Sequence, residues 1–184
     1  MRQSNRISKG KQINPTFFVF CEGKTEEHYL LYLRSKYKFP IDIKIVKSSI
    51  TEKLILNYKK NKPSHEKDKN YLMYDLDVEG MLQKLQLIKT AELISSNPCF
   101  EFWYLLHYQE HNAHLTSDDC KRKLLLHHKT YKKGTIDYKL KEKLIEKQDK
   151  AVHRAAKLKK HQNPSSLVFQ IINDIEAFRR SENI

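Results

Sequence analysis

One apolar stretch that ends at two acids constrains the possible folds of this chain more than any other feature of its sequence. Residues 71–80 read YLMYDLDVEG, so four apolar residues are followed by Asp75 and Asp77. Because side chains alternate along a strand, the two carboxylates point the same way if the chain stays extended. Two carboxylates on one face repel each other unless a cation lies between them, and Mg²⁺ is the usual hard cation for such ligands.

A second apolar run ends in a matching way. Residues 17–21 read FFVFC and lead into Glu22 and Gly23. Both runs are uninterrupted, which favours strands buried on both faces of a parallel sheet. Ligands of open α/β sheets bind outside the carboxyl ends of the strands, so Glu22, Asp75 and Asp77 are predicted to meet at one edge. The alternative for each acid is an ordinary loop residue that ends a strand.

The hydrophobic periodicity predicts an α/β core followed by helices only. The expected strands are residues 16–22, 41–46, the run that ends at the paired acids, and 92–95, with 41–46 half-exposed at an edge. The expected helices are residues 24–37, 51–58, 80–89, 100–108, 116–126 and 165–178, with further helix between the last two and breaks near Gly134 and Pro164. We expect three parts: a flexible basic arm (1–14), the α/β core (15–112) and a basic helical region packed on it (113–184).

Two further acids are candidates for the same site. Glu26 shares a helix face with Leu30 and Leu33, which should pack on the sheet and aim the carboxylate at the strand ends. It is either a second metal ligand or a partner of the helix dipole. Glu101 opens a helix that is apolar almost all round, where a charge needs a reason, either functional or as stabilisation of the helix terminus.

The positive charge is concentrated in one segment. The net charge is +13, and residues 121–160, which we term the basic segment, carry +11 of it from 15 Lys or Arg and 4 acids. Such clustering indicates a polyanion partner, and the alternative is a solvated helical face. The candidate nucleic-acid contacts are Lys24, Lys121, Arg122, Lys132, Lys133, Lys157, Lys159 and Lys160.

Several classes of protein are disfavoured. No stretch approaches ~20 apolar residues, and residues 1–14 lack the apolar core of a signal peptide, so we expect a cytoplasmic protein without a membrane partner. The three cysteines lack zinc-site spacing. His107, His111 and His114 stand at zinc-like spacing, but the region after Glu110 looks irregular, and no Glu directly follows the first His as it does in the HExxH motif of zinc proteases. With four glycines and no phosphate loop, the chain is not expected to bind ATP itself.

Three motifs together resemble a known family. They are CEGKTE at residues 21–26, DLDVEG at 75–80, and SNPCFEFW at 96–103 with His107 following. The first two resemble the Toprim motif set, a Glu-Gly and a DxDxxG. All three together resemble the RloB family of bacterial proteins associated with anti-phage defence. The resemblance covers roughly residues 16–110 and leaves the basic segment unmatched.

The resemblance implies a Toprim-like fold, a small and mostly parallel sheet flanked by helices. It implies a nuclease that cleaves phosphodiesters of DNA or of RNA such as tRNA with Mg²⁺, for which Mn²⁺ substitutes, and that an AAA-type ATPase gates. Glu22 would then be the acid of the first motif and Asp75 with Asp77 the metal-binding pair, and Glu101 is also indicated. The alternative is a catalytically silent nucleic-acid-binding or regulatory subunit of an ATPase complex. The sequence leaves open whether the chain forms a homodimer.

Overall fold

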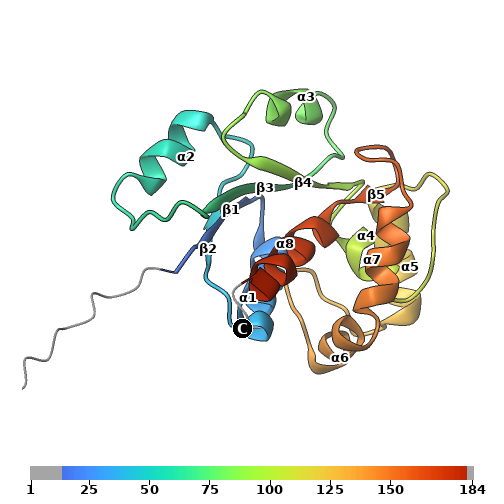
Figure 1. Ribbon diagram of the computed structural model, residues 1–184. Helices are drawn as coiled ribbons and strands as arrows, with labels where there is room; N and C mark the ends of the chain where they lie inside the picture. Colours follow the sequence, from blue (N-terminus) through green and yellow to red (C-terminus); the bar gives the residue numbers. More distant parts are fainter. Residues whose placement is uncertain (1–13, 182–184) are drawn as a thin grey trace, which may run out of the picture.

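A five-stranded sheet forms the centre of the molecule, with helices on both faces (Figure 1). The computed structural model describes residues 14–181. The strands are β1 (Phe17–Cys21), β2 (Ile41–Ile45), β3 (Lys69–Asp75), β4 (Glu92–Asn97) and β5 (Ser165–Ser166), in the order β2-β1-β3-β4-β5. The first four are parallel, and β5 runs antiparallel to β4. The predicted α/β class and the edge position of the second strand are confirmed, whereas the Toprim-like character stays a prediction.

The helices occupy two layers. They are α1 (Lys24–Tyr37), α2 (Glu52–Lys59), α3 (Met81–Gln86), α4 (Glu101–Leu106), α5 (Ser117–His127), α6 (Tyr138–Glu146), α7 (Gln148–Ala156) and α8 (Val168–Ser181). Figure 1 shows α2 and α3 above the sheet and the others below it. Within the described residues, no helix is long and apolar enough to cross a membrane.

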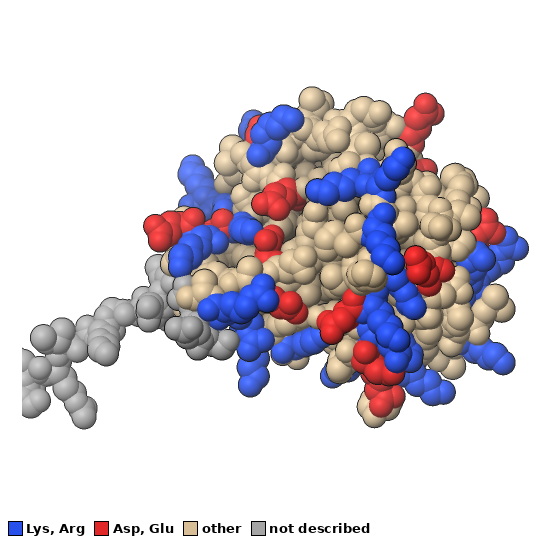
Figure 2. Space-filling view, turned by 45° about the vertical axis from the view of Figure 1, so that its right-hand side comes forward, with Lys and Arg blue, Asp and Glu red and all other residues tan. Residues whose placement is uncertain are grey.

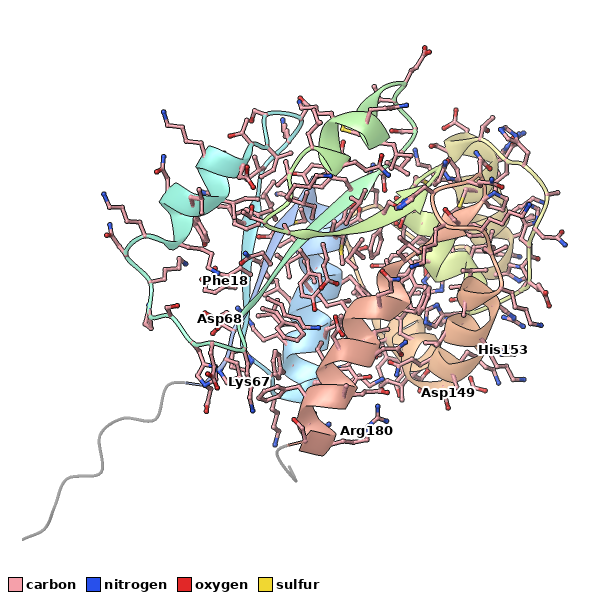
Figure 3. All side chains as sticks on the ribbon, turned by 45° about the horizontal axis from the view of Figure 1, so that its top comes forward. Phe18, Lys67, Asp68, Asp149, His153 and Arg180 are labelled. Atoms are coloured by element: carbon pink, nitrogen blue, oxygen red, sulfur yellow. The ribbon has the colours of Figure 1, made fainter. Side chains whose placement is uncertain are left out.

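Alternation along the strands builds a separate core on each face of the sheet. Phe18, Phe20 and Leu72 belong to the cluster that packs against α2 and α3, and Figure 3 shows Phe18 on the α2 side. Val19 and Tyr71 belong to the larger cluster beneath the other helices. The uninterrupted apolar runs are therefore explained, because every residue of β1 is buried on one face or the other.

The C-terminal region packs into the same large core as the N-terminal one. Trp103 of α4 shares a buried cluster with Leu124 of α5, Leu144 of α6, Ala151 of α7 and Ile171 of α8. The expected division at residue 112 stays a prediction, and the expected basic arm, residues 1–14, lies almost wholly outside the described residues.

One strand was not predicted, and it shortens the last helix at its start. Ser165 and Ser166 pair with Asn97 and Ser96, so α8 begins at Val168 and not at residue 165. Leu167, which lies within the expected helix 165–178, is buried but precedes the observed helix. A two-residue strand of serines carries no hydrophobic alternation, so the periodicity could not indicate it.

Candidate active site at the carboxyl edge of the sheet

Parallel pairing brings the ends of β1 and β3 together at one edge of the sheet. Cys21 pairs with Met73, so Glu22 and Asp75 follow on neighbouring strands. The backbone N–H of Asp75 donates a hydrogen bond to Glu22 Oε2 at 3.3 Å. These two acids, 53 residues apart in sequence, thus form the first contact of the site, as the strand-end pattern predicted.

Glu26 turns back toward the same edge from the first turn of α1. Its Oε2 accepts a hydrogen bond from the backbone N–H of Gly23 at 3.1 Å, and its side chain is buried. Burial, followed by the charges of Glu101 and Glu22, raises the pKa of Glu26 to about 7. Glu26 therefore interacts with the start of its helix and also lies near other carboxylates, and its role as a metal ligand stays a prediction.

Asp75 is buried at the end of β3. It is 9% exposed, and its Oδ1 is buried without a hydrogen-bond partner. Burial holds the pKa of Asp75 well above its usual range, and the carboxylates of Glu26, Glu101 and Glu22 raise it further. A buried carboxyl group among like charges keeps its proton unless a cation takes the place of that proton.

Glu101 completes the group from the start of α4. It is fully buried, its Oε1 accepts a hydrogen bond from the hydroxyl of Tyr131 at 3.1 Å, and its Oε2 is buried without a partner. We term Glu22, Glu26, Asp75 and Glu101 the carboxylate cluster. Their charges act on one another, because the pKa values of Glu26 and Asp75 are both raised by other members.

Asp77 follows the end of β3 in a more exposed position than Asp75. The strand ends at Asp75, although the backbone N–H of Leu76 still donates to the carbonyl oxygen of Ser96 on β4 at 2.9 Å. Asp77 is exposed, and the hydroxyl of Ser117 donates to its Oδ2 at 3.5 Å. The shared face of Asp75 and Asp77 and the metal-binding role of Asp77 both stay predictions.

The chemistry of the carboxylate cluster suits Mg²⁺. Its donors are all carboxylate oxygens, and two of them, Asp75 Oδ1 and Glu101 Oε2, are buried without a partner. Across residues 14–181, no three His, Cys, Asp or Glu side chains are arranged to hold one metal ion together. A Mg²⁺ ion at this edge would therefore have at most two ligands from the protein and would complete its shell with water and substrate phosphates.

The predicted nucleic-acid contacts lie at the surface. Five of them are exposed along the basic segment, namely Lys132, Lys133, Lys157, Lys159 and Lys160, and Lys24 is exposed at the start of α1. Lys121 and Arg122 pair with Asp118 and Asp119 on their own helix, which offsets part of their charge. Figure 2 shows Lys and Arg side chains spread over this side of the molecule with acids among them.

Sequence reasoning missed the hydroxyl partner of Glu101. Tyr131 lies 30 residues from Glu101 in sequence, and no local pattern links them. His107 is a buried polar side chain directly after α4, with Nδ1 at 2.9 Å from the carbonyl oxygen of Trp103.

Comparison with known families agrees with the motifs. The family model described as RloB-like protein matches residues 17–175, which is most of the chain. The chain belongs to the RloB-like protein family. The match extends beyond the resemblance in the motifs and includes the basic segment and most of α8. No curated protein and no solved structure matches this RloB-like sequence.

Proposed function

We propose that this RloB-like protein is a Mg²⁺-dependent nuclease that cleaves phosphodiester bonds of nucleic acid at the carboxylate cluster. The observation that carries the proposal is the convergence of Glu22, Glu26, Asp75 and Glu101, with two buried oxygens unpaired. A fold does not stabilise itself by burying carboxylates against one another, so the arrangement indicates a function that needs them.

In this proposal the carboxylates and the exposed lysines have different roles. The carboxylates would hold Mg²⁺, which in such sites activates water and offsets the charge that develops on the phosphoryl oxygens. The exposed lysines of the basic segment would hold the nucleic-acid backbone through its phosphates, which supplies affinity without reading sequence. A role in anti-phage defence and gating by an AAA-type ATPase belong to the same proposal.

A catalytically silent subunit is the second candidate. One observation favours it: in the part of the chain that the structure describes, three metal-binding side chains are not gathered around a single point. Such a subunit would bind nucleic acid through the same basic segment, and Asp75, whose pKa is raised well above its usual range, would keep its proton. Metal-dependent cleavage separates the two candidates, because charge alone supports both.

The decisive experiment combines cleavage with metal location. Purified protein is incubated with labelled DNA and RNA in Mg²⁺ or in EDTA, and Asp75→Asn is compared with Asp149→Asn. Asp149 is an exposed acid on α7, away from the sheet edge (Figure 3), so its variant matches the change in charge. We expect Mg²⁺-dependent cleavage that Asp75→Asn abolishes and Asp149→Asn preserves. Binding without cleavage, identical in wild type and Asp75→Asn, would establish the silent subunit.

A crystal soaked in Mn²⁺ supplies the independent check. We expect anomalous density within about 2.2 Å of oxygens of the carboxylate cluster. Density confined to other carboxylates would place the metal elsewhere and overturn this site.

A further inference from the structure

The connection between α5 and α6, residues 128–137, is fixed over the carboxylate cluster. Its two ends are joined, because His128 Nε2 lies 3.0 Å from Asp137 Oδ2. Its middle contacts α1, where the carbonyl oxygen of Gly134 accepts a hydrogen bond from His28 Nδ1. Although this connection belongs to the basic segment, it packs against the first turns of the helix that carries Glu26.

Tyr131 reaches the cluster from this connection. Its hydroxyl donates to Glu101 Oε1 at 3.1 Å, and its ring packs edge-on against Tyr104, with centroids 6.0 Å apart. Once one carboxylate oxygen is held, the direction of the other is fixed as well. Glu101 Oε2 is that other oxygen, and it is buried without a partner. Outer hydrogen bonds of this kind orient metal ligands in protein sites.

Lys133 follows two residues later, between the contacts made by Tyr131 and Gly134. Lys133 is exposed, yet the charges of the buried acids affect its pKa. Burial alone would lower the pKa of Lys133, but the carboxylates of Glu101, Asp75 and Glu26 outweigh it and raise the pKa. The pKa of Glu26 is lowered in return by Lys133. The backbone supplies the geometry, because Tyr131, two residues earlier, contacts Glu101, and Gly134, the next residue, contacts His28 on the helix that carries Glu26.

We propose that the connection formed by residues 128–137 is a working part of the active site. In this proposal Tyr131 is a positioning residue that orients Glu101 toward a divalent cation. Lys133 partly neutralises the cluster when no metal is present and contacts a substrate phosphate when metal is bound. The inference rests on the proposed function and assigns a new role to two residues of the C-terminal half.

The two residues have opposite effects on metal affinity, and this makes the proposal testable. Removing the Tyr131 hydroxyl frees Glu101 and weakens metal binding, whereas removing the Lys133 charge ends its repulsion of an incoming cation and strengthens binding. The test measures Mn²⁺ affinity of the full chain by electron paramagnetic resonance, together with cleavage, in Tyr131→Phe and Lys133→Met. Lys132→Met is the matched control, because it removes the same charge from the neighbouring exposed position.

We expect Tyr131→Phe to weaken Mn²⁺ binding by about 10-fold. We expect Lys133→Met to tighten Mn²⁺ binding several-fold and to slow cleavage by about 10-fold or more, since a charged contact to the phosphate is lost. Lys132→Met should leave Mn²⁺ affinity unchanged. Tyr131→Phe keeps the ring that packs on Tyr104, and a thermal unfolding midpoint close to that of the wild type verifies its fold.

Each failure has a distinct meaning. The inference would be overturned if Tyr131→Phe bound Mn²⁺ with wild-type affinity, or if Lys133→Met and Lys132→Met changed Mn²⁺ affinity equally. Either result would leave the proposed nuclease standing. The expected shifts in Mn²⁺ affinity without cleavage of any nucleic acid would support the role of the connection at the metal and overturn the nuclease proposal. A wild-type protein that binds no Mn²⁺ would overturn both.

Discussion

Glu22 accepts a hydrogen bond from the backbone N–H of Asp75 at 3.3 Å, so the first acid is held against the backbone that carries the second. Glu22 follows β1 and Asp75 ends β3, and the parallel register of these strands sets their separation. The same N–H that anchors Glu22 orients the end of β3, where Asp75 Oδ1 remains buried without a partner. Asp75, whose pKa is raised by burial and by neighbouring carboxylates, is therefore positioned by a strand in the interior of the sheet.

Neutralising Asp75 should stabilise the metal-free protein. In EDTA we expect Asp75→Asn to have the same unfolding midpoint as the wild type or a higher one, with a gain of up to about 1 kcal/mol in the free energy of unfolding. The reason is that a buried acid among other acids is replaced by a neutral amide. Added Mn²⁺ should raise the unfolding midpoint of the wild type and not that of the variant. Thermal unfolding followed by circular dichroism measures both effects.

Asp77→Asn is the control for this prediction. Asp77 is exposed and lies beyond the end of β3, so we expect a stability change within about 0.5 kcal/mol and a smaller loss of Mn²⁺ stabilisation. If Asp77→Asn abolishes Mn²⁺ stabilisation as fully as Asp75→Asn does, Asp77 is a principal ligand and the loop after β3 moves on metal binding.

The sequence predicted the sheet edge because the signals there are strong and local. Two uninterrupted apolar runs indicate strands buried on both faces of a parallel sheet, and because β1 pairs with β3 their acidic ends are neighbours. The position of Glu26 followed from helical periodicity with Leu30 and Leu33, both buried. Patterns of this kind depend on a few adjacent residues, which makes them readable without a structure.

The remaining features of the site depend on contacts that no local pattern encodes. The exposure of Asp77 depends on the path of the chain after β3 and on its contact with Ser117, 40 residues away in sequence. Tyr131 meets Glu101 because α5 packs on α4, a tertiary contact that brings a loop back over the sheet edge. Nothing in the sequence distinguishes Lys133 from the other lysines of the basic segment, because only the path of this loop brings it near the acids.

His107 should make the stability of the fold depend on pH. Burial is the main cause that lowers the pKa of His107, to about 4 from the ordinary 6.5. Above pH 6.5 the ring is neutral in the folded and unfolded states, so its contribution is complete. As the pH falls from 6.5 toward 4, the unfolded chain binds a proton that the folded chain does not, and stability falls by roughly 3 kcal/mol. Urea unfolding across this range measures the slope.

The variant His107→Asn isolates this effect. Asn keeps a side-chain N–H for the carbonyl oxygen of Trp103 but does not titrate. The variant can lose stability at every pH, yet the difference between wild type and variant should shrink as the pH falls from 6.5 to 4. A constant difference would show that His107 is not held neutral in the folded protein.

Gly134 should tolerate a methyl group poorly for two reasons. Its φ of +73° is left-handed, and a Cβ there would lie 3.3 Å from Lys24 Cβ. We expect Gly134→Ala to cost about 1–2 kcal/mol from the backbone alone, with a further cost from the crowding against α1. Gly80 has a similar φ of +77° with open space around it, so Gly80→Ala measures the backbone cost alone. Chemical denaturation of both variants should show a larger loss in the free energy of unfolding for Gly134→Ala than for Gly80→Ala. Equal losses would show that residues 128–137 shift to relieve the crowding against α1 at no cost in stability.

The basic segment should supply sequence-independent binding. Replacing Lys132, Lys157, Lys159 and Lys160 with Gln should weaken binding of different DNA and RNA sequences almost equally, because phosphate contacts carry charge but little sequence information. Each lost contact should reduce the slope of log K against log salt by about 0.7–0.9, or by about 3 for all four. Fluorescence anisotropy over a salt series measures the slope.

A second set of four lysines makes the test specific to position and not to net charge. Lys47, Lys53, Lys60 and Lys89 are also exposed, but they belong to the part of the chain around α2 and α3, on the opposite face of the sheet. Their replacement with Gln removes the same charge, so a nonspecific effect of net charge would appear equally in both sets. We expect the salt slope to fall only in the first set, with Mn²⁺ binding preserved in both, since neither set includes Lys133 or a carboxylate. An equal fall in the two sets would mean that nucleic acid senses the whole field of the protein, and an unchanged slope in the first set would assign its lysines to solvent or to a protein partner.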